Sequence, residues 1–241
     1  MFSRVTSRLP RLLGRMPALR LPALALAMTC ASLASAHAHL VWFEQAPDKS
    51  IVLKFGDYLE KTETSPGHLD AIPETPAWTP GEKGPELAKA TRGKEGVTYE
   101  KATADKPLFA DIELAVRPPK ADAPPSRTIY HPRWYVPGTP APTAAVEPRQ
   151  DFEIVPQPGD KVIVFLRGKP MPEIKLSVEE PDGKKQELVT DKDGSAVLKL
   201  TKPGLNLVIA RFREDLGGWY RGVPYKQTSH IAVLSITAPT P

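Results

Sequence analysis

The sequence predicts an all-β protein made of two small antiparallel β-sandwich domains. Proline accounts for 28 of the 241 residues, which is more than twice the usual share of about 5%, so helices should be scarce. Short segments in which apolar and polar residues alternate recur along the chain, as in strands with one solvated face. Turn sequences with glycine, proline or aspartate separate many of these segments. Together these features favour a sandwich.

The first 36 residues have the features of a secretory signal peptide. Five arginines and no acidic residue precede an apolar run from Leu21 to about Ala31, and small residues then end in Ala34-Ser35-Ala36. This order of a charged region, an apolar region and an A-x-A cleavage site is typical of exported proteins. The apolar run is shorter than the roughly 20 residues that a membrane span requires, and no later segment approaches that length. We therefore expect a periplasmic protein with no membrane span after removal of 1–36.

The charge balance gives no indication of a nucleic-acid partner. The whole chain has 32 basic and 28 acidic residues, but the leader contains five of the arginines, which leaves 27 basic against 28 acidic residues. A nearly neutral chain lacks the basic surface that nucleic acid or an anionic membrane would require. Cys30, the only cysteine, follows Ala27-Met28-Thr29 in the leader, which fits a lipoprotein signal poorly. The exported chain should therefore have no disulfide and no thiolate ligand.

Residues 37–136 are predicted to form an N-terminal β domain. The segments "IVLKFG" from Ile51 and "KPLFADIELAV" over Lys106–Val116 show the alternation of strands. Between them, Pro73–Gly96 is rich in Pro, Gly, Glu and Lys without a sustained period, which predicts a loop with at most one helical turn at "ELAKATR". The proline-rich stretch 137–150 follows and is the predicted linker to a second domain.

Residues 151–238 are predicted to form a second β-sandwich. In "EIKLSVEE", Ile174, Leu176 and Val178 lie on one face and the polar residues between them on the other, as in a sheet with one solvated side. Glycine turns separate several segments, at Pro181-Asp182-Gly183, Asp191-Lys192-Asp193-Gly194 and Lys202-Pro203-Gly204. The β-type segments are "DFEIV", "DKVIVFLRG", "EIKLSVEE", "KQELVTD", "SAVLKL", "LNLVIARF" and "SHIAVLSIT".

The segment "FLRGKPMPEIKLSVEEPDGKKQELVTDKDGSAVLKLTKPGLNLVIARF" resembles the transthyretin-like, carboxypeptidase-regulatory-like sandwich in its order of G-x-P, two DG turns, PG and an aliphatic strand. With "HAHLVWFE" near the start and "SHIAVLSI" near the end, Ala36 to Thr237 resembles a domain-of-unknown-function family of periplasmic proteins. Its members are commonly labelled periplasmic components of nickel or cobalt transport. The resemblance implies a transthyretin-like, immunoglobulin-like second domain, bound Ni²⁺ or Co²⁺, and a membrane metal-transport system as partner.

Two histidines, His37 and His39, stand at the predicted start of the exported chain. After cleavage behind Ala36, the α-amine and imidazole of His37 could chelate Cu²⁺ together with a distant histidine. Alternatively, the amine, two backbone amides and the His39 imidazole could form a square-planar site for Cu²⁺ or Ni²⁺. Cleavage behind Ala38 is equally allowed and would leave His39 with the free amine. The segment "HAHLV" is also similar to the start of the copper-resistance protein C family, periplasmic copper carriers whose first residue is a histidine ligand. We predict both histidines as metal ligands, against the alternative that they are solvated.

The other three histidines lie in different contexts. His230 begins the last strand with the same parity as Ala232, and it is predicted to be a metal ligand or to support the ligands; the alternative is a polar residue at a sandwich edge. His131, in "YHPRWY", is predicted to pack in an aromatic cluster. His68 is predicted to lie on a loop, where Asp70 nearby could supply an oxygen ligand.

The chain shows no G-x-S-x-G, no H-E-x-x-H and no phosphate-binding glycine loop. We therefore expect a binding protein rather than an enzyme, namely a periplasmic transition-metal-binding protein that exchanges nickel, cobalt or copper with a membrane transport system. An alternative from another class is a metal-free adhesion or scaffold module, which would bind a protein or glycan through the sandwich and the aromatic "GGWYRGVPYK" loop.

Overall fold

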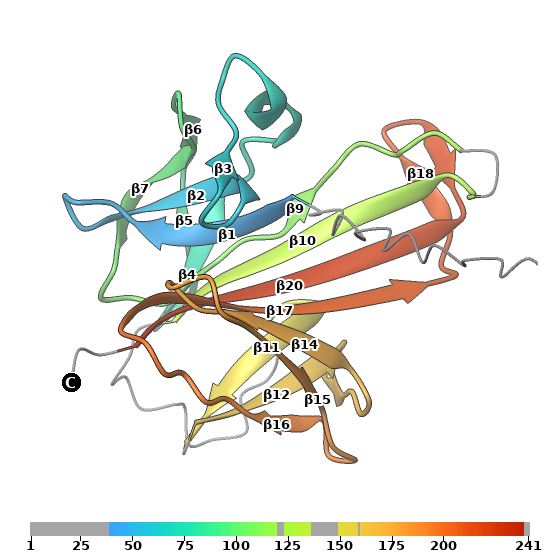
Figure 1. Cartoon of the computed structure of the whole chain (residues 1–241). Coiled ribbons are helices and arrows are strands. Elements are labelled where there is room, and N and C mark those ends of the chain that lie inside the picture. The colour runs from blue at the N-terminus through green and yellow to red at the C-terminus, as the bar shows by residue number, and fades with distance from the viewer. Residues whose placement is uncertain (1–38, 120–122, 136–148, 159, 239–241) are drawn as a thin grey trace, which may run out of the picture. The chain divides into compact units, whose positions relative to one another are not determined.

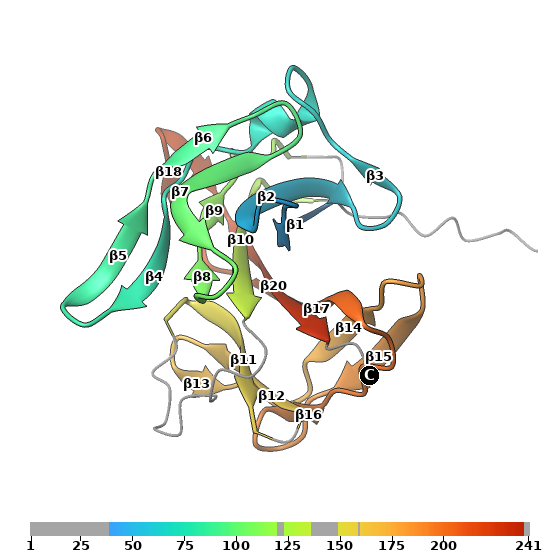
Figure 2. The same cartoon turned by 90° about the vertical axis from the view of Figure 1, so that its left-hand side faces the viewer.

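The computed structural model describes residues 39–119, 123–135, 149–158 and 160–238. The predicted signal peptide, His37 and most of the predicted linker 137–150 lie outside the described residues. From His37 onward the chain forms one compact unit. It contains four sheets, which Figure 1 and Figure 2 show from two sides.

The first sheet has five strands in the order β1–β2–β7–β6, with β3 paired to β2. Its strands are β1 (Leu40–Gln45), β2 (Ser50–Asp57), β3 (Lys61–Thr62), β6 (Ala90–Arg92) and β7 (Val97–Thr103). A short 3-10 helix, η1 (His68–Ala71), follows β3.

The second sheet has nine strands in the order β15–β14–β17–β20–β10–β8–β4–β5, with β9 paired to β10. Its strands are β4 (Ala77–Gly81), β5 (Gly84–Ala88), β8 (Leu108–Phe109), β9 (Ile112–Glu113), β10 (Ser126–Tyr135), β14 (Lys175–Glu179), β15 (Lys185–Val189), β17 (Gly204–Glu214) and β20 (Gln227–Ala238). The strands β10 and β20 pair in parallel. The sheet is therefore mixed, and the prediction of purely antiparallel sheets was wrong at this pair.

Two smaller sheets complete the fold. The third sheet contains β11 (Phe152–Gln157), β12 (Lys161–Leu166), β13 (Lys169–Pro170) and β16 (Ser195–Val197), and the fourth is the hairpin β18 (Gly218–Tyr220) with β19 (Val223–Tyr225). The all-β prediction is confirmed: the described residues contain no α-helix. Likewise, no helix in the described part of the chain is long and apolar enough to cross a membrane.

The strands β17, β20 and β10 form the centre of the fold, with β1 and β2 on one side and β11 and β12 on the other (Figure 1). Apolar side chains pack on both sides of these central strands. On one side, here called the β1 side, Leu207, Ile209 and Val233 pack against Leu40 and Trp42 of β1. On the other, here called the β11 side, side chains of β17 and β20 pack against β11 and β12; this cluster includes Phe152, Ile154, Val162, Val164, Val208, Ala210, Ala232 and Leu234. A third cluster lies between the first sheet and β10. Strands covered on both faces read as near-continuous apolar runs, as "LNLVIA" does.

The nine-stranded sheet contains strands from both sides of the predicted linker. The strand β10 comes from the half 37–136, and β14, β15, β17 and β20 come from the half 151–238. The two halves are therefore not built on separate sheets. A buried ion pair also joins them, because Arg133 of β10 contacts Glu153 of β11 at 2.5 Å. Whether the second half folds alone stays a prediction.

The stretch Pro73–Gly96 was predicted to be a loop, and this was wrong. It contains the antiparallel hairpin β4–β5 and the strand β6, and "ELAKATR" is extended rather than helical. The hairpin turns at Gly84, which has a positive φ of 122°, and Trp78 stacks on Phe109 with ring centroids 4.5 Å apart. Proline is uncommon inside strands, so the prolines of this stretch argued against strands in the sequence. In the structure Pro80 nevertheless pairs with Pro85 in the hairpin.

The alternation predicted in "EIKLSVEE" is confirmed, because Leu176 and Val178 are buried and the polar residues of β14 are more exposed. The turn glycines Gly183, Gly194 and Gly204 have positive φ angles. At Gly194 a side chain is also excluded by space, since an added Cβ would lie 2.9 Å from the backbone nitrogen of Met171.

The buried ion pair provides a test of how strongly the two halves depend on each other. Replacing Arg133 with methionine leaves the Glu153 carboxylate, whose side chain is 0% exposed, without its charge partner. We expect Arg133→Met to lower the free energy of unfolding by about 3–5 kcal/mol. Adding Glu153→Gln should recover much of this loss, because the amide keeps an acceptor for the backbone N–H of Arg149. Urea denaturation of the single and double variants checks this; equal stability of Arg133→Met and wild type would contradict it.

Candidate metal site

His39 lies immediately before β1, and its position is fixed by contacts with two other strands. The hydroxyl of Tyr130, on β10, donates a hydrogen bond to the His39 carbonyl at 2.8 Å. The His39 ring packs against Phe55 of β2, with ring centroids 5.2 Å apart. The imidazole is therefore held at the junction of the first sheet and the central strands.

Glu63 is brought beside His39 by the tight turn from β2 to β3. This turn requires Gly56, because an added Cβ there would lie 2.3 Å from the Lys61 carbonyl oxygen. The backbone N–H of Glu63 donates to the Phe55 carbonyl at 2.7 Å. Its side chain is 9% exposed, and Oε1 lies 2.8 Å from Nε2 of His39. The hydrogen bond from His39, with the charges of Lys61 and His68 nearby, holds the pKa of the Glu63 carboxyl below its ordinary value.

His68 is the first residue of η1, which places it on the other side of Glu63. Its Nδ1 lies 3.5 Å from Glu63 Oε2, and its side chain is 78% exposed. The buried Leu69 anchors this turn. Asp70, considered as a ligand from the sequence, instead accepts hydrogen bonds from the Ser65 hydroxyl at 2.6 Å and the Gly67 N–H at 2.9 Å.

His39, Glu63 and His68 form a group that could hold a metal ion. One ligand atom from each lies within 4.8 Å of those of the other two. Two imidazole nitrogens and one carboxylate oxygen suit a divalent transition metal such as Zn²⁺, Ni²⁺, Co²⁺ or Cu²⁺ better than Mg²⁺ or Ca²⁺. Three protein ligands on a partly open surface also leave coordination positions for other donors.

Asp57 provides a further feature of this group. Its Oδ1 is buried without a hydrogen-bond partner and lies 3.8 Å from Nδ1 of His39. A metal bound at His39 Nε2 would leave the proton on Nδ1, which faces this carboxylate. A small rotation of the ring would then let Nδ1–H of His39 donate a hydrogen bond to Asp57 Oδ1, which is otherwise buried without a partner.

His230 was predicted as a third ligand, and the structure shows that both of its ring nitrogens have partners. Nδ1 lies 3.0 Å from Nε2 of His131, and Nε2 lies 2.9 Å from Glu214 Oε1. His131 in turn contacts Asp111 through Nδ1 at 2.7 Å. The two rings stack 5.3 Å apart and contact Phe152, so His131 packs among rings as predicted. The four polar residues form one chain, Asp111–His131–His230–Glu214.

His230 does not belong to the group formed by His39, Glu63 and His68. It is 2% exposed, and metal binding there would break the contacts to His131 and Glu214. Its role as a ligand stays a prediction, as does that of His37, which lies outside the described residues. The residue that the sequence analysis missed is Glu63. The only local signal for it is its spacing of five residues from His68 across the turn "TSPG".

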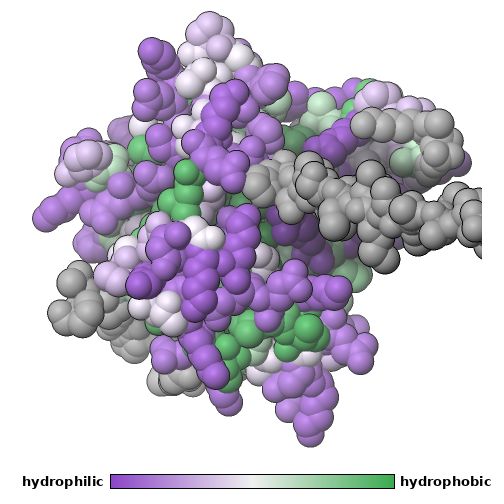
Figure 3. All heavy atoms as spheres, in the orientation of Figure 1, coloured by the Kyte–Doolittle hydropathy of each residue, from purple (hydrophilic) through white to green (hydrophobic). Residues whose placement is uncertain are grey.

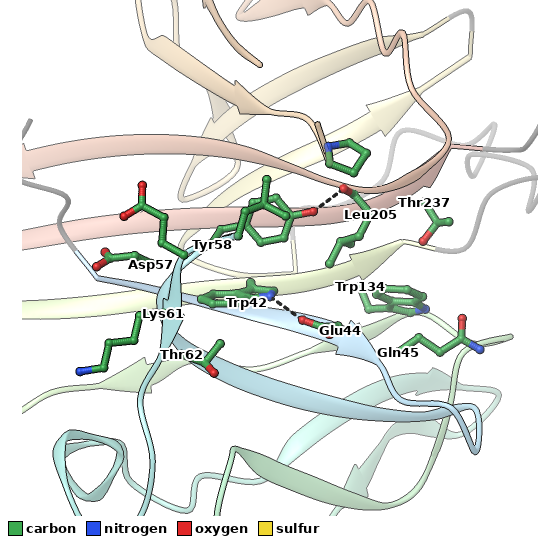
Figure 4. Close-up of a pocket in the computed structure, with 13 residues that line it drawn as sticks. Trp42, Glu44, Gln45, Asp57, Tyr58, Lys61, Thr62, Trp134, Leu205 and Thr237 are labelled. Carbon is green, nitrogen blue, oxygen red and sulfur yellow. Dashed lines mark hydrogen bonds between the residues drawn. The ribbon is translucent and has the colours of Figure 1, made fainter. Parts of the chain in front are cut away.

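A separate pocket of about 580 Å³ lies beside the candidate metal site, between β1, β2 and the start of β17. In Figure 4, the Tyr58 hydroxyl donates to the Leu205 carbonyl, and Trp42 reaches Glu44. Burial, with the charges of Glu44 and Glu179, raises the pKa of Tyr58 to about 12, so the phenol keeps its proton for this bond. The Tyr58 hydrogen bond joins the end of β2 to the central strand β17. Tests against protein-family models, curated proteins and solved structures found no match to this chain.

The buried histidine chain should make stability depend on pH. Burial lowers the pKa of His230 from its ordinary 6.5, and the hydrogen bond to Glu214 only partly opposes this. Below pH 6.5 the unfolded chain therefore binds a proton more readily than the folded chain, so acidification favours unfolding. The contribution is present above pH 6.5 and is lost as pH falls through the lowered pKa.

We expect the free energy of unfolding to fall between about pH 6.5 and 5, by at most about 1.4 kcal/mol per pH unit for one proton. His230→Gln should flatten this slope, because it removes the buried group whose pKa is lowered on folding. Urea denaturation with a chelator present, repeated across this pH range, measures the slope for wild type and the variant. Identical slopes for wild type and His230→Gln would contradict the assignment.

Proposed function

We propose that this protein binds a divalent transition metal through His39, Glu63 and His68. The observation that carries the proposal is the convergence of two imidazoles and a largely buried carboxylate from three separate segments. Carboxylates are rarely buried without cationic partners, and a bound cation could take the place of the contacts that Glu63 makes with His39, His68 and Lys61. The unpartnered Asp57 oxygen beside His39 supports the same reading.

The α-amine of the exported chain would add a nitrogen if the leader is removed behind Ala38. His39 then carries the free amine, which can close a chelate with Nδ1 of the same residue. In this form of the site the imidazole would bind through Nδ1 in place of Nε2, and one residue would supply two nitrogens that are already close together. The Tyr130 hydrogen bond to the His39 carbonyl fixes the backbone of this residue. A site with an amine, two imidazoles and a carboxylate is rich in nitrogen and favours Cu²⁺ or Ni²⁺, and then Co²⁺, over harder cations.

The proposed setting is the periplasm, with 1–36 as a cleaved leader and a membrane metal-transport system as the partner. We also propose that 151–238 is a transthyretin-like sandwich that supports binding rather than catalysis. This agrees with the packing of β11 and β12 against β14, β17 and β20 around one apolar cluster. The glycine turns of the resembling segment agree with it too.

A metal-free adhesion or scaffold module remains the second candidate, and one observation favours it. The hairpin β18–β19 presents Trp219, which is 74% exposed. An exposed tryptophan is a common anchor in protein and glycan contacts. The face shown in Figure 3 is mostly hydrophilic, with apolar side chains in separate groups. A single exposed tryptophan supports this candidate less strongly than three convergent ligands support metal binding.

Removal of the ligands tests the proposed function. We expect His39→Ala, Glu63→Gln and His68→Ala each to weaken binding of Ni²⁺ or Cu²⁺ by at least about 10- to 100-fold, because each removes a direct ligand. Glu86→Gln, at an exposed glutamate of β5, is the matched control and should leave the affinity unchanged. Calorimetric titration of the exported chain measures the affinities. Equal affinities for wild type and all three ligand variants would favour the scaffold module.

The role of the amine can be tested separately by changing only the start of the chain. A form that begins at His39 should bind Cu²⁺ more tightly than the same form with an acetylated amine, because acetylation removes the amine as a ligand and changes no side chain. Mass spectrometry of the secreted protein establishes which start occurs naturally. Equal affinities of the two forms would exclude the amine as a ligand and leave the three side chains as the site.

A further inference from the structure

A pocket of about 670 Å³ opens directly beside His39, on the β1 side of the central strands. Its floor follows from the strand register. Arg211 of β17 pairs with Ile231 of β20, which pairs with Tyr130 of β10. One step along the same side, Arg213, Ser229 and Thr128 are aligned in the same way. Alternate residues of paired strands share a face, so these side chains line one surface.

The pocket exists because β1 begins at Leu40. From that residue onward β1 covers the central strands, with Leu40 and Trp42 packed on Leu207, Ile209 and Val233. Beyond Ile209 the same face continues with Arg211 and Arg213, where β1 no longer covers it. His39 therefore stands at the edge of the pocket and belongs to both the pocket and the candidate metal site.

The pocket contains three arginines whose charges are not neutralised. Arg211, Arg213 and Arg117 line it, and none of them forms an ion pair with any residue that the structure describes. Several other arginines of the fold are paired with carboxylates: Arg127 with Glu113, Arg133 with Glu153 and Arg167 with Glu214. Three unpaired guanidinium groups around one hollow create a positive potential that attracts anions.

Hydroxyl groups accompany the arginines in the pocket. Ser229 accepts a hydrogen bond from Nε of Arg213 at 3.3 Å, which orients that guanidinium. Burial raises the pKa of Tyr130, and the charges of Arg117 and Arg211 act against this rise. Both arginines line the same pocket as Tyr130, the residue that holds His39. Guanidinium and hydroxyl donors together match carboxylate oxygens, which arginine can bind through two parallel hydrogen bonds.

We propose that this pocket binds the carboxylates of an anionic metal chelate, whose metal ion is bound at His39. The inference rests on the proposed function and names its substrate class as a small polycarboxylate complex of a divalent transition metal. A bare dication would be repelled by three arginines, whereas a chelate with net negative charge is attracted. The metal site leaves coordination positions for chelate donors, and the pocket volume lies within the range of about 300–1,000 Å³ for small-molecule sites.

Calorimetric titration of the exported chain with nickel citrate, with Ni²⁺ alone and with citrate alone tests the proposal. We expect the double variant Arg211→Gln, Arg213→Gln to bind nickel citrate at least about tenfold more weakly than wild type, since it loses two charge-assisted contacts. Its affinity for Ni²⁺ alone should stay within about twofold of wild type, or rise, because a positive charge beside the metal is removed. Arg211→Lys keeps the charge but not the paired donors, and should give a smaller loss for nickel citrate.

The control variant Lys175→Gln, Lys192→Gln removes two positive charges from exposed positions outside the pocket, and should bind nickel citrate as wild type does. Circular dichroism verifies that each variant is folded. If wild type binds Ni²⁺, but the arginine double variant binds nickel citrate as tightly as the lysine control variant does, the chelate pocket is excluded and the metal site stands. If wild type does not bind Ni²⁺ and His39→Ala changes nothing, the proposed function fails, and this inference fails with it.

Discussion

The parallel pairing of β10 with β20 is the constraint on which the rest of the structure depends. It places a strand from the first half of the chain inside a sheet built mainly from the second half. The three strands β17, β20 and β10 are then covered on both sides, by β1 and by β11. Parallel strands are usually buried on both faces, and this pair is too. Breaking this pairing would uncover two apolar layers at once.

The same register separates the polar residues of the central strands into two sites. Tyr130 and Arg211 project to the β1 side, toward His39. His131 and His230 project to the β11 side, where they contact each other and Phe152. A shift of one residue in the register would exchange these two sets. The candidate metal site and the buried histidine chain therefore depend on the same backbone alignment while remaining on opposite faces.

Local sequence patterns predicted the parts of the fold that are local. The alternation in β14 and the turn glycines of 151–238 depend on neighbouring residues, and both are confirmed. The pairing of β10 with β20 joins residues about 100 positions apart, which no local period encodes. The hairpin β4–β5 was missed because its prolines and polar residues resemble a loop, although Trp78 anchors it on Phe109.

The candidate site was predicted only in part, because local patterns do not show which distant residues come together. His39 was recognisable from its place near the predicted start of the exported chain. Glu63 stands in the polar stretch "KTETS" and is largely buried only because its backbone bonds to Phe55 across a turn that Gly56 permits. His230 has the parity expected of an inward-facing residue, and that parity is confirmed. However, parity alone does not identify the neighbours of a side chain, which here are His131 and Glu214.

The net charge of the chain also gives no indication of how its charges are distributed in the fold. Outside the leader the basic and acidic residues nearly balance, which would suggest a surface without strong fields. Several carboxylates, however, are paired with Arg127, Arg133 and Arg167, and the pair with Arg133 is buried. This leaves Arg117, Arg211 and Arg213 uncompensated around one pocket. β1 begins at Leu40 and leaves the central strands uncovered beyond that point. The three guanidinium charges and the candidate nitrogen and oxygen ligands around His39 therefore lie next to each other. Under the proposed function, a nearly neutral chain would place a cation site beside an anion site, the arrangement that a ligand containing both a metal ion and carboxylates requires.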